Sequence, residues 1–551
     1  MARLTGGELA VRTLSAAGVD LVFGIVSVHN VPIYDAMNRL GSVRPVPVRH
    51  EQAAVLMADG YSRASGRLGV ALTSTGPGAA NAMGSMVEAY TASSPVLHLT
   101  GQVESQYLGK AKGFLHEARD QLAMLAASSK WAGRPNSTRE IPVVLGEAIR
   151  QAVTGRRRPV SVELPIDLQN AEDEADVPVF EGFARLEPSS DEITRAAQIV
   201  AGAKRPLIWA GGGVIASEAS AELRTLAELL RAGVITSNTG RGSLPEDHPL
   251  CIGNLSVEAP VQDLAKEADV LIAIGTRFQG SPTQNWRMTL PDTIVHMDID
   301  PTEIGKNYPA AQGVTGDARP ALAALVAALG GRVQTEMGWP ERVAQTRAAA
   351  RAALRERIGQ HAKIMDSLRA ALPRDAIVVK DATISAYTWG NRLLEVYEPR
   401  TSMNPTCGAI GPGLPLALGA ATARPDRQVV CIAGDGGFVY NMAELATAVQ
   451  QQLPVVVLLF NDGGYGILRH IQDRAFEGRR IAVDLHTPDF AKVAEAFGVW
   501  SRRVDRIEAF NPALTEALAA GGPALIEIDS RAIGPMPTPY AGTSRQQATR
   551  P

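Results

Sequence analysis

The sequence has 551 residues, of which 45% are hydrophobic and 20% are charged, and its formal net charge at pH 7 is −3. This length exceeds what one hydrophobic core supports and suits about three domains of ordinary size. The charges form no long single-sign blocks, so we expect neither nucleic acid nor a membrane as a partner, which leaves small molecules.

Cysteine use and the N-terminal pattern predict a cytoplasmic protein. Cys251, Cys407 and Cys431 are scattered without CxxC spacing, which argues against disulfides and zinc and fits a reducing compartment. Glu8 and Arg12 lie four residues apart in an amphipathic pattern that differs from the apolar centre of a signal peptide. No apolar run approaches the ~20 residues that span a bilayer.

Residues 1–172 alternate helical patterns with short apolar runs, the order of an α/β domain. Glu51 follows one predicted strand and opens a helix, and the turn Gly76-Pro77-Gly78 follows another. Both lie where the carboxyl ends of parallel strands bind ligands. The predicted strands are residues 21–24, 43–48, 70–73, 96–100 and 160–164.

A proline-containing linker over residues 170–192 precedes a second α/β domain, predicted over residues 190–332. Its glycine turn, Gly211–Gly213, follows the apolar run 206–210, and a second buried strand is predicted over residues 270–275. Residues 341–357 are rich in arginine and alanine and predict an exposed helical connector to a third domain over residues 360–551.

The third domain contains the most informative segment, residues 428–466. A predicted strand over residues 429–433 ends at Gly434-Asp435-Gly436-Gly437, where glycines allow a tight bend and a close approach of backbone N–H groups to a diphosphate. Asn441 and Glu444 have the spacing of a helix capping box for a helix over residues 442–452. A second strand, residues 455–460, ends at Asn461-Asp462-Gly463-Gly464.

Two parallel strands joined by a helix bring their carboxyl ends to one sheet edge, so we expect Asp435 to meet Asn461 and Asp462 there. One Asp, a second Asp or Asn, and a loop carbonyl form an oxygen ligand set that suits Mg²⁺ with phosphate oxygens. A Gly-Asp-Gly turn alone is weak evidence, because such a turn also serves only to connect strands.

The complete pattern, a GDG turn, a helix, and a buried strand that ends in Asn-Asp, resembles the diphosphate and metal motif of thiamine diphosphate (ThDP) enzymes. Within these enzymes the chain is similar to the acetolactate synthase, benzoylformate decarboxylase and benzaldehyde lyase group, along nearly its whole length. MDIDPTEIGKN at residues 297–307 resembles the central domain of acetolactate synthases. The resemblance implies three doubly wound parallel-sheet domains: pyrimidine-binding, central and diphosphate-binding.

The resemblance also assigns roles to residues. It implies that Glu51 bonds the pyrimidine nitrogen of ThDP, that Ile410 props the bent cofactor, and that Asp435, Asp462 and the carbonyl of Gly464 bind Mg²⁺. Relatives usually have Asn-Asn where this chain has Asn461-Asp462, so Asn461 is the fallback ligand. The expected cofactor-binding residues are Glu51, Gly76, Pro77, Gly78, Asn81, Ile410, Gly434, Gly436, Gly437, Asn461 and Tyr465.

His29 and His116 are the expected proton carriers, because imidazole exchanges protons near neutral pH. Through the resemblance, His29 lies in a loop where benzaldehyde lyase has a histidine, and His116 replaces a common glutamine. A structural role is the alternative for each. Residues 467–472 lack the tryptophan with which acetolactate synthases favour a larger acceptor, which departs from that family.

These observations predict a ThDP- and Mg²⁺-dependent enzyme that decarboxylates a 2-oxo acid and joins the product to a second carbonyl, as acetolactate synthases do. The alternatives are a 2-oxo-acid decarboxylase or benzaldehyde lyase-like C–C lyase, a flavin-dependent oxidase, and a non-catalytic subunit. The resemblance leaves two possibilities open for the central domain: FAD bound against Gly211–Gly213 and the residues near Arg277, or no flavin. The resemblance implies a 2-oxo acid or hydroxy ketone and an aldehyde as substrates, and a homodimer or homotetramer with its active site at the subunit interface.

Overall fold

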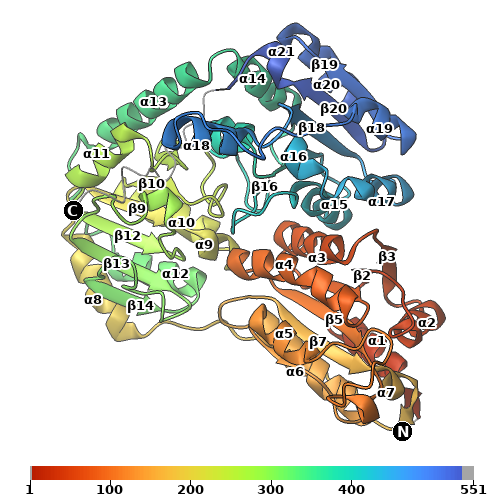
Figure 1. The fold of residues 1–551 in the computed structure, drawn as a ribbon. Coiled ribbons are helices and arrows are strands. Elements are labelled where there is room, and N and C mark those ends of the chain that lie inside the picture. Colours follow the sequence, from red (N-terminus) through yellow and green to blue (C-terminus); the bar gives the residue numbers. More distant parts are fainter. Residues whose placement is uncertain (1–2, 537–551) are drawn as a thin grey trace.

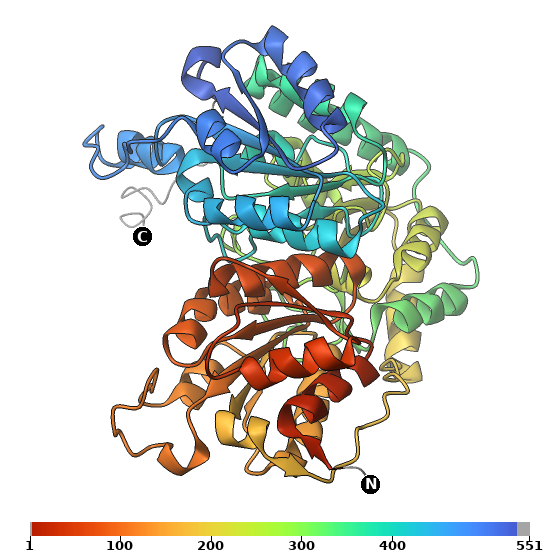
Figure 2. The ribbon, with the colours of Figure 1, turned by 90° about the vertical axis from the view of Figure 1, so that its right-hand side faces the viewer.

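A computed structural model describes residues 3–536 of the chain. It contains three six-stranded sheets whose strands are all parallel, each flanked by helices, which confirms the predicted α/β class and the three doubly wound domains. Figure 2 shows the N-terminal domain (red to orange) stacked under the C-terminal domain (cyan to blue), with the central domain (yellow to green) beside both. None of the helices in the described part combines the length and the apolar character needed to cross a membrane.

The N-terminal sheet has the strand order β3-β2-β4-β5-β7-β6. Its inner strands are buried on both faces, which explains their continuous apolar sequences. The strands are β2 (Leu21–Gly24), β3 (Arg44–Pro47), β4 (Gly69–Thr73), β5 (Val96–Gln102), β6 (Ala132–Gly133) and β7 (Val160–Pro165). The helices are α1 (Gly6–Ala16), α2 (Val31–Leu40), α3 (Glu51–Ser65), α4 (Pro77–Ala92), α5 (Gln121–Ala127), α6 (Ile141–Val153) and α7 (Ile166–Asn170). A separate antiparallel pair joins β1 (Leu4–Thr5) to β8 (Glu172–Asp173).

The central sheet has the order β11-β10-β9-β12-β13-β14, and the predicted turn Gly211–Gly213 follows its middle strand β9. The strands are β9 (Pro206–Ala210), β10 (Gly233–Thr236), β11 (Cys251–Gly253), β12 (Val270–Ile274), β13 (Thr293–Asp298) and β14 (Gln312–Thr315). The helices are α8 (Ser190–Ala201), α9 (Gly212–Ala216), α10 (Ser220–Leu230), α11 (Ala259–Glu267) and α12 (Ala318–Leu329).

The C-terminal sheet has the order β16-β15-β17-β18-β20-β19, so the two strands with the acidic turns, β17 and β18, are neighbours. The strands are β15 (Ile377–Lys380), β16 (Ser402–Met403), β17 (Val429–Gly434), β18 (Val455–Asn461), β19 (Trp500–Val504) and β20 (Ala524–Asp529). The helices are α15 (Gly413–Ala423), α16 (Asp435–Phe438), α17 (Leu445–Gln450), α18 (Gly466–Ala475), α19 (Phe490–Ala496), α20 (Phe510–Ala519) and α21 (Ser530–Ile533).

The connector between the last two domains consists of α13 (Trp339–Ile358) and α14 (His361–Ala371). The prediction of an exposed connector is wrong for one face of α13. Every third or fourth residue of that face is buried, and the indole nitrogen of Trp339 donates a hydrogen bond to the carbonyl of Pro206 over 2.9 Å. Arginines on the opposite face hid this apolar stripe in the composition. The buried residues are Trp339, Val343, Thr346, Ala350, Leu354 and Ile358.

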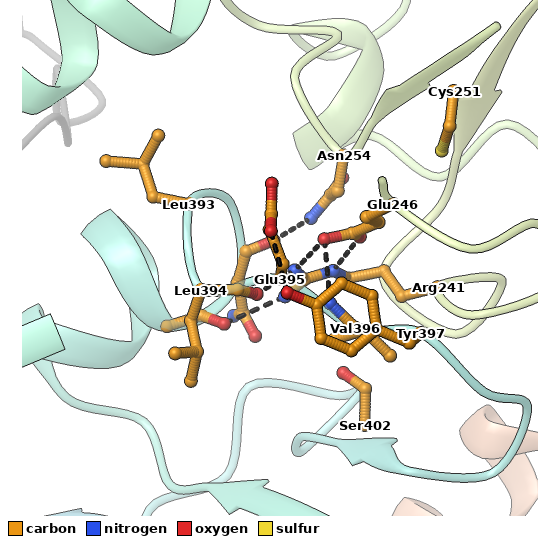
Figure 3. Close-up of polar contacts among 12 residues, drawn as sticks. Arg241, Glu246, Cys251, Asn254, Leu393, Leu394, Glu395, Val396, Tyr397 and Ser402 are labelled. Atoms are coloured by element: carbon orange, nitrogen blue, oxygen red, sulfur yellow. Dashed lines mark hydrogen bonds and ion pairs between the residues drawn. The ribbon is translucent and has the colours of Figure 1, made fainter. Parts of the chain in front are cut away.

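A buried ion pair fastens the central domain to the C-terminal domain (Figure 3). Arg241 and Glu246, which are 1% and 3% exposed, form a bidentate pair with two contacts of 2.7 Å. Arg241 also donates to the carbonyl of Gly390 over 2.8 Å, and Glu246 accepts from the backbone N–H of Val396 over 3.1 Å. Both charges are thus paired and hydrogen-bonded, as burial requires.

The N-terminal and C-terminal domains meet through helices α3 and α15, which face each other in Figure 1. Their backbones touch: a Cβ on Gly60 would lie 2.1 Å from the carbonyl oxygen of Leu416, and a Cβ on Gly419 would lie 2.0 Å from that of Met57. Only glycine permits this approach. The contact fixes the start of α3, and therefore Glu51, relative to the C-terminal sheet.

Candidate active site

Asp435 and Asp462 converge at the carboxyl edge of the C-terminal sheet, as the strand pattern predicted. Asp435 begins α16 directly after β17, and Asp462 directly follows β18. The two turns are tied together because the backbone N–H of Gly464 donates a hydrogen bond to Oδ2 of Asp435 over 2.8 Å.

The electrostatics of this pair favour a bound cation. Burial, followed by the charge of Asp462, raises the pKa of Asp435 to about 6. Burial also raises the pKa of Asp462, although nearby Arg469 opposes this effect. Oδ1 of Asp462 is buried and accepts no hydrogen bond within residues 3–536; its ion-pair contact with Arg469 measures 3.4 Å. Two carboxylates at one sheet edge, one of them with an oxygen that accepts no hydrogen bond, form a donor set that fits Mg²⁺.

Asn461, the fallback metal ligand, points away from this site. It is 3% exposed, and its amide donates a hydrogen bond to the buried carboxylate of Glu527 over 2.8 Å. Its side-chain oxygen accepts from the backbone N–H of Gly463 over 3.1 Å. Both ends of the amide are therefore engaged, whereas Asp462 faces the cavity.

A cavity of about 750 Å³ lies above this edge. Every predicted C-terminal residue except Asn461 lines it: Ile410, Gly434, Asp435, Gly436, Gly437, Asp462, Gly464 and Tyr465. Glycine is required in its wall, since a Cβ on Gly436 would lie 2.8 Å from the ring of Tyr465 and one on Gly434 would lie 2.9 Å from Thr383. The wall is thus backbone-lined and adjoins a cation site, which fits a diphosphate. No residue from the described part of the N-terminal domain lines this cavity.

The N-terminal domain groups its own predicted residues at the start of α3 and α4. Asn81 donates a hydrogen bond to Oε2 of Glu51 over 3.0 Å, and a Cβ on Gly78 would lie 3.0 Å from Oε1 of Glu51. Glu51 is half-buried, and Pro77 and Asn81 are exposed. The carboxylate is held beside the glycine turn and remains open to a ligand.

His29 and His116 lie together beside the same turn. Their ring centroids are 5.3 Å apart, and Nδ1 of each is buried without a hydrogen bond in the described residues. Burial, followed by the charge of His116, lowers the pKa of His29 below its usual range. A Cβ on Gly76 would lie 2.1 Å from the carbonyl oxygen of His116, so the turn and this histidine are in backbone contact.

The predicted capping box at Asn441 and Glu444 is wrong. Residues Met442–Glu444 form a 3-10 turn before α17, and the amide of Asn441 donates instead to the carbonyl of Gly411 over 2.8 Å. Glu444 accepts from the backbone N–H groups of Arg49 and His50, over 2.9 and 3.1 Å. A C-terminal carboxylate thus holds the residues just before Glu51, and long-range contact replaced the local cap.

Sequence reasoning missed Asp381, a 2% exposed carboxylate that anchors the loop of Ile410. Its neighbour Thr383 lines the cavity. The signal was present, because Asp381 directly follows the apolar strand β15 in the same sheet as β17 and β18. Asp435 and Asp462 were predicted because each directly follows a buried parallel strand, and Asp381 meets the same criterion.

A second cavity, of about 350 Å³, lies where the three domains meet and contains Gly212, Gly213 and Arg277 in its wall. Arg157, Arg277 and Arg400, one from each domain, line it, and none of the three forms an ion pair within residues 3–536. Burial lowers the pKa of each. Asp298, Glu303 and Asp317 line the same cavity, but none of them forms an ion pair with these three arginines, and desolvated cations outside an ion pair favour an anionic ligand.

Comparison with protein families agrees with this geometry. Residues 4–124, 193–325 and 384–528 match, in order, the N-terminal TPP binding domain, the central domain and the C-terminal TPP binding domain of thiamine pyrophosphate enzymes, where TPP is ThDP. The chain belongs to the ThDP-dependent enzymes of the acetolactate synthase group.

Individual relatives carry more than one activity. The chain is 37% identical to the probable 2-ketoarginine decarboxylase of Pseudomonas aeruginosa, over 95% of this chain and 94% of that protein. It is 34% identical to the large subunit of acetolactate synthase isozyme 3 of Escherichia coli, over 94% of this chain and 93% of that protein. It is also 34% identical to the probable acetolactate synthase large subunit of Methanocaldococcus jannaschii, over 95% and 92%.

Proposed function

We propose that this enzyme uses ThDP and Mg²⁺ to decarboxylate a 2-oxo acid and to join the resulting fragment to a second carbonyl. When bound, ThDP supplies a nucleophilic carbon and accepts the electrons released as the carboxylate leaves. The observation that carries the proposal is the convergence of Asp435, Asp462 and Gly464 on a glycine-lined cavity. Similarity to acetolactate synthases over most of the chain supports it.

Asp435, Asp462 and the carbonyl of Gly464 would hold Mg²⁺, and the backbone of Gly434–Gly437 would hold the diphosphate. A dication relieves the repulsion between two carboxylates, one of which has a pKa raised to about 6. Mg²⁺ commonly binds one or two carboxylates and completes its shell with phosphate oxygens. Because the side chain of Asn461 is engaged by Glu527, the geometry favours Asp462 as the second ligand.

Glu51 would bond the pyrimidine ring of ThDP from a second copy of the chain. The C-terminal cavity contains no N-terminal residue, so one chain does not bring Glu51 into it. Large hydrophobic residues beside both half-sites are exposed: Val26 and Val28 precede His29, and Leu115 adjoins His116, at 59%, 60% and 60% exposure, while Tyr440 near Asp435 is 55% exposed. A symmetric dimer, or a tetramer built from two, would cover these residues and complete two sites.

His29 and His116 would hold and move a proton at the carbonyl oxygen of the substrate. Their adjacent rings and free Nδ1 atoms allow transfer from one imidazole to the other. The lowered pKa keeps His29 neutral near pH 7, so its ring is in the form that can accept a proton.

A 2-oxo-acid decarboxylase, or a C–C lyase, is the second candidate. The relative from Pseudomonas aeruginosa supports the decarboxylase, and residues 467–472 lack the tryptophan associated above with larger acceptors. The histidine pair favours this candidate further, since releasing an aldehyde requires proton delivery rather than attack on a second carbonyl.

The central cavity is the proposed site for FAD, with the diphosphate against Arg157, Arg277 and Arg400. Gly213 and Gly275 line this cavity, and they pack so closely that a Cβ on Gly213 would lie 2.6 Å from the Cα of Gly275, which only glycine permits. A flavin-free enzyme is the alternative, and a flavin-dependent oxidase is the third function.

The unpaired cysteines, two of them buried, support a cytoplasmic location.

The test is to incubate the purified enzyme with ThDP, Mg²⁺ and each of pyruvate, benzoylformate and benzoin, and to identify products by mass spectrometry. A carboligase yields hydroxy ketones together with CO₂, a decarboxylase yields aldehydes and CO₂, and a lyase splits benzoin. The colour and mass of extracted cofactors decide whether FAD is bound. No ThDP-dependent product from these or other 2-oxo acids would contradict the proposal.

A further inference from the structure

The loop that carries Ile410 connects the two cavities. It runs from Asn404, after β16, to Gly413, the first residue of α15. Asn404 and Thr406 line the central cavity, whereas Gly408 and Ile410 line the cofactor cavity. We call residues 404–413 the bridging loop.

The first half of the bridging loop is held by Glu88 of the N-terminal domain, a residue on α4 with no exposed surface. Its carboxylate accepts from the backbone N–H and the hydroxyl of Thr406, over 2.7 and 2.9 Å, and from the N–H of Cys407 over 3.0 Å. Arg63 pairs with Glu88 at 2.8 Å and donates to the carbonyl of Asn404 over 2.8 Å.

The second half is held by Asp381. Its carboxylate accepts from the backbone N–H of Gly411 over 3.0 Å and from that of Gly413 over 3.1 Å. Gly411 has a φ of +96°, and a Cβ there would lie 2.8 Å from Cβ of Tyr440, so the backbone is fixed from the opposite side as well. Ile410 immediately precedes this anchored glycine.

Burying two carboxylates to hold one loop costs free energy, because each carboxylate loses its hydration when the chain folds. Burial raises the pKa of Asp381 to about 6, although its backbone hydrogen bonds oppose this. For Glu88, Arg63 and the donors at Cys407 outweigh burial and lower the pKa. Moving the loop would take from both carboxylates the backbone hydrogen bonds that it donates, and losing a hydrogen bond to a buried charged group costs more than losing an ordinary one.

We infer that Asp381 and Glu88 are positioning residues that set the bridging loop, and with it the depth at which Ile410 stands in the cofactor cavity. The inference rests on the proposed function, in which Ile410 supports the bound cofactor. Neither carboxylate lines the cofactor cavity, so both act through the loop.

The experiment compares Asp381→Asn and Glu88→Gln with Asp269→Asn, a matched control. Asp269 accepts two backbone N–H groups, those of Lys204 and Arg205, over 2.8 and 2.9 Å, but it lies in the central domain. The first readout is amide hydrogen exchange of residues 404–413 in the cofactor-free protein, followed by mass spectrometry. We expect exchange about tenfold faster in the two loop variants and unchanged in the control.

The second readout is exchange of the C2 proton of bound ThDP, set against the ThDP dissociation constant. We expect the C2 exchange rate to fall at least tenfold in Asp381→Asn, with a smaller change in affinity. Asp381→Asn added to Ile410→Ala should cause little further loss, because residues that act together are non-additive. Glu88→Gln provides the same comparison if Asp381→Asn does not fold.

Wild-type amide exchange in the loop of both variants would overturn the inference, as would a loosened loop with an unchanged C2 exchange rate. Additive losses in the double variant would also contradict it. If the wild-type enzyme itself neither binds ThDP nor exchanges its C2 proton, the proposed function fails instead. The amide readout separates these outcomes because it needs no cofactor.

Discussion

The amide of Asn461 donates a hydrogen bond to the carboxylate of Glu527, over 2.8 Å, at a point where neither residue is exposed to the cofactor cavity. This contact separates two adjacent residues that look interchangeable in the sequence. Asn461 belongs to the packing of the sheet, and Asp462 belongs to the cavity.

Asp462→Ala is expected to weaken Mg²⁺ and ThDP binding together by at least tenfold, because the metal bridges the protein and the diphosphate. Asn461→Ala is expected to leave Mg²⁺ affinity within a few-fold but to lower protein stability by roughly 1–3 kcal/mol, since it leaves Glu527 with an unmet buried acceptor. Titration of each variant with both cofactors, and the thermal midpoint of each apo-protein, measure the two effects. A larger loss of Mg²⁺ affinity in Asn461→Ala would assign the ligand role to that residue.

His29→Ala is expected to lower turnover roughly 10²- to 10⁴-fold while ThDP affinity and C2 proton exchange stay near wild type, because a placed acid–base group acts after the cofactor is activated. His486→Ala, at an exposed position, is the control. Turnover that survives within a few-fold on every accepted substrate would make His29 a structural loop residue.

The pH dependence of turnover should reflect the lowered pKa of His29. Its neutral ring is the form that accepts a proton, and His116 faces it at a centroid distance of 5.3 Å. Turnover should therefore persist below the usual imidazole range of about 6.5 and fall only as the pH drops through the lowered value. In His116→Ala, where this neighbour is gone, the fall should move to higher pH. An unmoved profile would show that the two rings are not coupled.

Two inactive variants should complement each other if the site lies between chains. Co-expressed Glu51→Gln and Asp435→Ala chains form mixed dimers with one site that is intact and one that lacks both residues. Random pairing should restore about a quarter of wild-type activity. Either variant expressed alone is the control. If a mixture shown to contain mixed dimers recovered no activity, Glu51 would serve the cavity of its own chain.

Lys380 offers a test of stability against pH. It is 1% exposed, its amine donates to the hydroxyl of Ser402 over 2.6 Å, and burial lowers its pKa far below the usual value. The unfolded chain keeps the proton up to about pH 10, so the free energy of unfolding rises with pH from the lowered pKa to about 10.

Lys380→Met removes this proton linkage. The variant should melt at a higher temperature than wild type at pH 7, by about 2–4 °C, and its melting temperature should rise less between pH 7 and 9. Lys363→Met, at an exposed position of α14, should change neither. If the melting temperature of Lys380→Met rose between pH 7 and 9 as steeply as that of wild type, Lys380 would be charged in the folded wild-type protein, which would contradict the lowered pKa.

The sequence predicted the elements whose signal is local. Buried parallel strands appear as apolar runs, and the residues directly after them, such as Asp435 and Asp462, reach the sheet edge by geometry alone. The roles that it missed come from contacts between distant segments. Glu444 has the spacing of a local cap, yet its partners Arg49 and His50 are nearly 400 residues away in sequence. Local patterns do not contain such partners. The buried face of α13 was missed for a different reason, because the arginines on its other face hid the apolar stripe.

The central claim is that Glu51, held by Asn81 over 3.0 Å, activates ThDP in the cavity of Asp435 and Asp462. The most direct test is the exchange of the C2 proton of enzyme-bound ThDP for deuterium, followed by NMR in wild type and Glu51→Gln. The account predicts that Glu51→Gln binds ThDP nearly as tightly as wild type but exchanges the C2 proton slower by about 10² or more. An exchange rate equal to that of wild type, with ThDP bound, would contradict it.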